Sequence, residues 1–138
     1  MSCQIVPVLQ RKRFDWGYLA AAGQQLVVLQ AAIPASCFYY VQLWVRVHAL
    51  SFSGNQIVGV ALYDTFPCED DHREFTKTSA AFTSLSFTSS TSPPALLSAS
   101  GTSPGPYLKA LLTGYQDTAV AGTFYTELSV SLVLRSAQ

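Results

Sequence analysis

The densest group of chemically active side chains lies in residues 64–78, DTFPCEDDHREFTKT. Five carboxylates and one imidazole fall within eleven positions there: Asp64, Glu69, Asp70, Asp71, His72 and Glu74. Calcium needs about six to eight oxygen ligands at controlled positions. The segment lacks the D-x-[DN]-x-[DN]-G spacing of a calcium loop, and Arg73 and Lys77 neutralise part of its charge. We therefore predict a solvated loop that faces a partner and holds no metal, with a cation site as the alternative.

A catalytic centre would need a nucleophile and a base, and the sequence has only two histidines, His48 and His72. It contains no G-x-S-x-G nucleophile motif, phosphate-binding glycine loop or dinucleotide fingerprint. Cys68 and His72 lie four residues apart, a spacing that would align them on a helix, but Pro67 favours a loop. We predict that the protein is not an enzyme and has no cofactor.

The three cysteines, Cys3, Cys37 and Cys68, are far apart and form no C-x-x-C pair. An odd number at such spacing indicates neither a disulfide framework nor a thiolate zinc site. We predict small buried side chains in a reducing compartment.

The composition is poor in charge. Charged residues make up 12% of the 138 residues, against about 25% in typical domains. Eight basic residues balance eight acidic ones, which disfavours attraction to nucleic acid or to an anionic membrane. The mean hydropathy is +0.26, so we expect a partner or further copies of the chain to cover apolar surface.

Targeting signals are not evident either. No apolar run approaches the about 20 residues of a membrane-spanning helix. At the start of the chain, the basic cluster follows the apolar segment, the reverse of the order in a secretory signal. We predict one domain, no signal peptide and assembly inside the cell.

Two segments alternate between apolar and polar residues, as strands with one buried face do. In residues 38–51 the apolar positions include Val41, Leu43, Val45 and Val47. In residues 123–135 they run from Phe124 to Leu134. Shorter strands are predicted at these ranges: 24–30, 56–63, 79–90, 95–99 and 107–113. Residues 53–55 (SGN) predict a hairpin-like pairing of 38–51 with 56–63.

These strands, and the lack of a long amphipathic helix, predict an all-β fold. We expect a two-sheet antiparallel β-sandwich of jelly-roll type over residues 24–138, with a closed small barrel as the alternative. Residues 1–23 are predicted to form an irregular N-terminal arm that reaches a neighbouring subunit. Deletion of residues 1–18 is then expected to abolish assembly and leave the sandwich folded.

Aromatic and basic residues are the candidates for an interface, because Trp, Tyr and Arg are enriched at binding hot spots. The predicted interface residues are Arg11, Lys12, Arg13, Trp16, Trp44, Arg46, Tyr107 and Tyr125. Trp44 shares the polar face of its strand with Arg46 and His48. An array of Trp and Tyr with polar neighbours also binds sugars, so a carbohydrate-binding module is the alternative function.

Two stretches carry a resemblance to a known class of protein: FYYVQLWVRVHALSFSGNQIVGVALYDTFPCEDD and TFYTELSVSLVLR. Over residues 24–135 the chain resembles small β-sandwich proteins that decorate the heads of tailed phages and phage-like particles. The resemblance implies a structural protein of a virion, such as a capsid decoration protein or minor virion component. The implied partners are copies of the chain or a shell protein.

Overall fold

The computed structural model describes residues 3–16, 23–52, 56–65, 81–116 and 124–136. Within these ranges the chain is all-β and has eight strands: β1 (Cys3–Asp15), β2 (Gly23–Pro34), β3 (Tyr40–Ser51), β4 (Gln56–Thr65), β5 (Thr83–Phe87), β6 (Ala95–Thr102), β7 (Tyr107–Gln116) and β8 (Tyr125–Arg135). No helix in the described ranges is long and apolar enough to cross a membrane.

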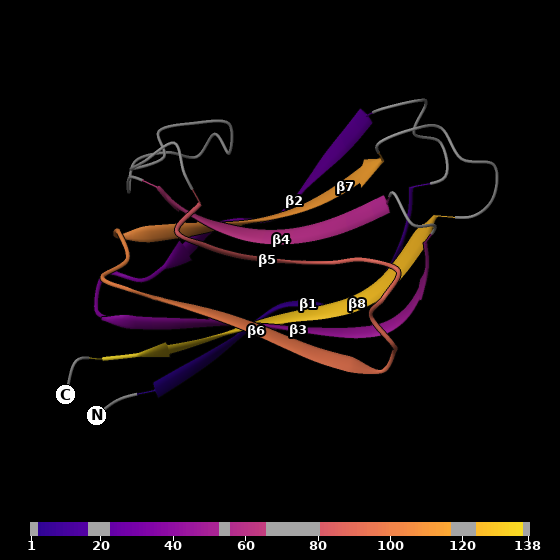
Figure 1. Cartoon of the computed structure of the whole chain (residues 1–138). Coiled ribbons are helices and arrows are strands. Elements are labelled where there is room, and N and C mark those ends of the chain that lie inside the picture. Colours follow the sequence, from indigo (N-terminus) through magenta and orange to yellow (C-terminus); the bar gives the residue numbers. More distant parts are fainter. Residues whose placement is uncertain (1–2, 17–22, 53–55, 66–80, 117–123, 137–138) are drawn as a thin grey trace.

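The strands form two four-stranded antiparallel sheets that face each other (Figure 1). The first sheet has the order β1-β8-β3-β6 and the second has the order β2-β7-β4-β5. The ladders β1–β8, β2–β7, β3–β6 and β4–β5 are those of one long double strand folded over on itself. This is the connectivity of a jelly roll, so the predicted fold class is confirmed.

Alternating side chains of β3 and β8 build half of the core. Val41, Leu43, Val45 and Val47 of β3 are fully buried, as is every second residue of β8 from Leu128 to Leu134. The second sheet contributes Val58, Val60, Leu62, Leu108, Ala110 and Leu112 from β4 and β7. The prediction from alternation is therefore confirmed for both long strands, up to a register shift after Val47.

A row of stacked and edge-on aromatic rings fills one end of the sandwich. The ring of Trp16 lies 5.9 Å from that of Phe14 and 6.2 Å from that of Phe124. Phe52 continues the row, 5.1 Å from Phe124 and 5.9 Å from Phe87. This aromatic row links β1 to β5, which lie in different sheets.

The predicted hairpin between residues 38–51 and 56–63 is wrong. β3 pairs with β6 and β8, whereas β4 pairs with β5 and β7 in the other sheet. The connection crosses from one sheet to the other, and this lets the apolar faces of both strands meet across the core.

The predicted irregular arm is also wrong for most of its length, because Cys3–Asp15 forms the edge strand β1. Register shifts between Pro7 and Leu9 and between Leu9 and Lys12 interrupt its ladder with β8. These irregularities break the period of two, and Pro7 argues against a central strand. The sequence pattern therefore hides the strand.

Candidate interaction surfaces

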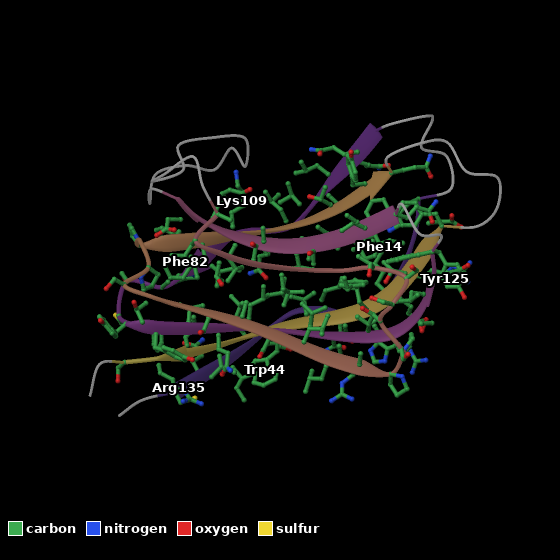
Figure 2. The ribbon with its side chains drawn as sticks, in the orientation of Figure 1. Phe14, Trp44, Phe82, Lys109, Tyr125 and Arg135 are labelled. Atoms are coloured by element: carbon green, nitrogen blue, oxygen red, sulfur yellow. The ribbon has the colours of Figure 1, made fainter. Side chains whose placement is uncertain are left out.

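The outer face of the first sheet gathers five of the predicted interface residues: Arg11, Arg13, Trp44, Arg46 and Tyr125. They come from β1, β3 and β8. Trp44, Arg46 and Tyr125 point away from the second sheet because their neighbours along the strand are buried. Arg11 and Arg13 contact outward side chains of β8. Figure 2 shows Trp44 and Arg135 on this outer side. We call this surface the arginine face.

The irregularity in β1 determines how Arg11 is held. Its φ of 21° lies in the left-handed region, and its backbone N–H donates to Ser129 Oγ at 2.9 Å. Its Nε forms an ion pair with Glu127 Oε1 at 3.1 Å. With 67% of the Arg11 side chain exposed, water weakens this pair, which contributes orientation more than stability.

The other two basic residues of the N-terminal triplet point in different directions. The Arg13 guanidinium lies over the ring of Tyr125 on the arginine face, 3.8 Å from its centroid. Lys12 Nζ lies 5.4 Å from the ring centroid of Phe14, a residue that packs against the core. The predicted basic cluster is thus split between two positions by the alternation of β1.

An open pocket of about 330 Å³ lies between the middle strands of the arginine face, lined by Trp44, Arg46, Leu96, Ser129 and Ser131. The register explains the lining. Trp44 stands between Ser131 of β8 and Ser98 of β6, and Arg46 stands between Ser129 and Leu96. Side chains at such opposed positions lie about 5 Å apart at Cβ, so five side chains share one small surface.

A serine and a histidine also meet on this face. His48 Nε2 and Ser129 Oγ are 2.8 Å apart, a contact between residues 81 positions apart in the chain. Serine catalysis requires the imidazole to be oriented by a third group. Among the described residues no acidic side chain bonds to His48, and the nearby Glu127 pairs with Arg11. Together with the hydrogen bond from the Arg11 N–H, the contact holds the Ser129 side chain between β1 and β3.

Besides Lys12, two predicted interface residues lie elsewhere. Trp16 is 1% exposed and belongs to the core, so its assignment to an interface is wrong. Its backbone N–H donates to the Phe124 carbonyl at 2.7 Å, which turns the ring inward at the end of β1. Tyr107 is half-buried at the start of β7 in the second sheet, opposite Pro34 of β2.

The first residue of the acidic segment lies in a strand and not in the predicted loop. Asp64, expected in a solvated loop, is the penultimate residue of β4 and is 5% exposed. Its Oδ2 accepts a hydrogen bond from the backbone N–H of the buried Gly105 at 2.7 Å. Glu69, Asp70, Asp71 and Glu74 lie outside the described residues. In the part of the chain that the structure describes, no three metal-binding side chains come together.

Replacement of Asp64 tests this structural role. Asp64→Ala leaves the buried Gly105 N–H without its acceptor, so we expect a loss of about 1–3 kcal/mol in the free energy of unfolding. Asp64→Asn keeps an acceptor oxygen and should lose less. Urea denaturation of both variants measures the difference, and equal losses would contradict the assigned hydrogen bond.

The outer face of the second sheet is a surface that the prediction missed. Leu26 of β2 is 50% exposed, Ile57 of β4 is 37% exposed and Tyr115 of β7 is 36% exposed. Ile57 and Tyr115 are direct cross-strand partners, and Leu26 lies two positions along the neighbouring strand. No described side chain on this face is both charged and exposed. We call this surface the apolar face.

A signal for the apolar face was present in the sequence. β2 reads LVVL at its centre and β7 reads LL, so apolar residues occupy both faces of these strands. An antiparallel sheet with one solvated face shows alternation instead, and an apolar run indicates cover on both faces. β3 and β8, in contrast, alternate over most of their length, and this difference distinguishes the two sheets.

Two cysteines contradict the prediction of burial. Cys3 and Cys37 are both exposed and free. Cys3 lies at the start of edge strand β1, and Cys37 lies in the turn before β3. Both positions are at element ends, where the core does not extend.

Comparison with known proteins identifies the fold. No protein-family model matches the sequence, and no curated protein does. Among solved structures, that of the Gx strain of infectious bursal disease virus matches 98% of this chain and 32% of that chain, with a TM-score of 0.60 and 15% identity. The VP2 subviral particle of infectious bursal disease virus matches the same shares with a TM-score of 0.61 and 14% identity.

These structural similarities support a statement about the fold only. This chain spans about a third of the length of both viral chains, and at such low identity the likeness shows the fold alone. CsCBM6-3 from Clostridium stercorarium, solved with cellobiose, matches 99% of this chain and 88% of that chain at 11% identity. Its TM-score of 0.37 is too low to support an argument about carbohydrate binding.

Proposed function

We propose that this chain is a non-enzymatic structural protein of a virus-like particle, a capsid decoration protein or minor virion component that packs on neighbouring subunits. Its jelly-roll fold, similar to that in the two viral structures, is compatible with this role. The apolar face is the observation that carries the proposal.

The apolar face supports packing on a neighbour because of its composition. Leu26, Ile57 and Tyr115 are at least one third exposed and lie on adjacent strands. A lone domain seldom leaves such side chains together in water without charged neighbours. Burial of apolar surface contributes about 25 cal/mol per Å², so a second subunit on this face is stabilising.

Copies of the chain are the first partner to test. We expect light scattering after size-exclusion chromatography to give a mass above that of the 14.9 kDa monomer. Ile57→Lys places a charge on the apolar face, opposite Tyr115, and should shift the protein to monomer. Ser100→Lys adds the same charge to the outer face of the other sheet, where Ser100 is exposed, and should leave the mass unchanged.

The result can contradict the proposal in two ways. A wild-type chain that remains monomeric at every concentration would remove self-packing as its basis. An oligomer that Ile57→Lys and Ser100→Lys affect equally would show that the apolar face is not the contact.

A further inference from the structure

The arginine face carries an excess of positive charge in a chain whose total charge is zero. The described charged side chains on this face are four arginines and two carboxylates: Arg11, Arg13, Arg46, Arg135, Asp15 and Glu127. Four against two leaves a net charge of +2 on the face. A surface of this kind favours an anionic ligand.

Arg46 is the arginine that remains available. Arg11 pairs with Glu127, Arg13 stacks on Tyr125, and the Arg135 guanidinium lies 5.8 Å from the ring centroid of Tyr40. Arg46 has no acidic or aromatic partner among the described residues, and its side chain is exposed. Its planar guanidinium has five N–H donors in a geometry that matches a carboxylate.

The surroundings of Arg46 fit a ligand that is more than a bare anion. The half-buried Trp44 stands next to it along β3 on the same face, and both line the pocket of about 330 Å³. An indole offers a flat apolar surface, on which the C–H face of a sugar ring can stack. Ser131 lines the same pocket and supplies a hydroxyl group that can donate and accept hydrogen bonds, whereas the Ser129 hydroxyl is already bonded to the Arg11 N–H and to His48.

We propose that the pocket between Trp44 and Leu96 binds a carboxylated sugar residue. The sugar ring stacks on Trp44, its carboxylate pairs with Arg46, and its hydroxyl groups bond to Ser131 at the pocket wall. The volume lies near the lower end of the usual range for small-molecule sites, about 300–1,000 Å³, and suits a single residue of a longer glycan.

An acidic peptide is the competing ligand, and the lining disfavours it. A peptide carboxylate needs only donors, whereas the Ser131 hydroxyl of this pocket is both a donor and an acceptor. Serines also occupy the position opposite Trp44 on each side, Ser98 and Ser131. An aromatic ring flanked by hydroxyl groups matches a ligand that alternates C–H and O–H groups around a ring.

Two sugars that differ in one group give the test. Methyl β-glucuronide and methyl β-glucoside differ only in a carboxylate in place of a hydroxymethyl group. In an NMR titration of isotope-labelled protein, we expect the glucuronide to shift the indole N–H signal of Trp44 saturably, with an affinity about tenfold above that of the glucoside. Arg46→Gln should remove this preference. Trp44→Ala lacks that indole signal, so its binding is followed through the backbone N–H signals of Ser129 and Ser131, and it should bind neither sugar.

The control variant is Arg13→Gln, because Arg13 lies on the same face but is engaged with Tyr125 and does not line the pocket. It should bind both sugars as the wild type does. Equal affinity for the two sugars, or no shift with either, would overturn the inference. So would a pentaglutamate peptide that shifts the Trp44 signal where the glucuronide does not.

The inference goes beyond the proposed structural role and does not rest on it. The pocket lies on the arginine face, whereas the packing proposal concerns the apolar face of the other sheet. Ile57→Lys leaves the pocket intact, so sugar binding can be measured in a monomer. Failure of one proposal therefore leaves the other to be judged by its own experiment.

Discussion

A chain that lacks residues 1–16 is expected not to fold. The deletion removes the edge strand β1, which pairs with β8 along most of its length, from Cys3↔Arg135 to Asp15↔Tyr125. It also removes the buried Trp16 and the partly buried Val6, Leu9 and Phe14, which pack against the core. Total stabilities of domains are about 5–15 kcal/mol, and loss of a buried tryptophan alone costs about 3–5 kcal/mol.

The deleted chain should therefore show no cooperative thermal transition by near-UV circular dichroism. The matched control replaces Arg11, Lys12 and Arg13 together with glutamine, which removes the basic charge and keeps the strand. This control should melt within a few degrees of the wild type. A deleted chain with a cooperative transition close to that of the full chain would support the alternative, a separable arm.

Trp16→Ala is expected to be the most damaging single substitution, and Trp44→Ala is its matched control. The Trp16 ring lies between Phe14 and Phe124 in the aromatic row, and its removal should lower the free energy of unfolding by about 3–5 kcal/mol. Trp44 lies on the arginine face and is half-buried, so its loss should cost about 1 kcal/mol. Urea denaturation measures both, and equal costs would contradict the placement of Trp16 in the core.

Gly114 provides a second measurement of the same contact. A Cβ at this position of β7 would lie 2.5 Å from Trp16 Cδ2, so the ring packs directly on the glycine backbone. Gly114→Ala should therefore destabilise the wild type strongly. In the Trp16→Ala background the added methyl group enters vacated space, and the cost should fall. A double-mutant cycle with no coupling would show that the two residues do not touch.

The contrast between these residues explains how far the sequence predicts the fold. β3 and β8 alternate over most of their length and lie in the middle of their sheet, so their pattern reports burial directly. β1 lies at the edge and has two register shifts, and an alternation rule does not recognise such a strand. Which strands pair depends on the whole fold and not on the local sequence. The short segment between β3 and β4 therefore led to the wrong prediction that these two strands form a hairpin.

The residues of the candidate surfaces also differ in how far the sequence predicts their positions. Trp44 and Arg46 were predicted correctly as outward residues because their strand alternates. Trp16 follows a strand that was not recognised, so its direction was unknown. The role of Asp64 depends on Gly105, 41 residues away, and no local pattern reports that contact. The apolar runs of β2 and β7 indicate apolar residues on both faces of these strands, but only the sheet order brings Leu26, Tyr115 and Ile57 together as the apolar face.

The pairing of the first strand with the last has a consequence for how the protein reaches its native state. β1 pairs only with β8 among the described strands, and Cys3 and Arg135 are opposed at the end of that ladder. During synthesis β1 leaves the ribosome before β2 to β8 and has to wait for β8. Folding should therefore be slow, as it is for proteins with contacts between distant segments, and the unpaired β1 edge would then be open to pairing with another chain.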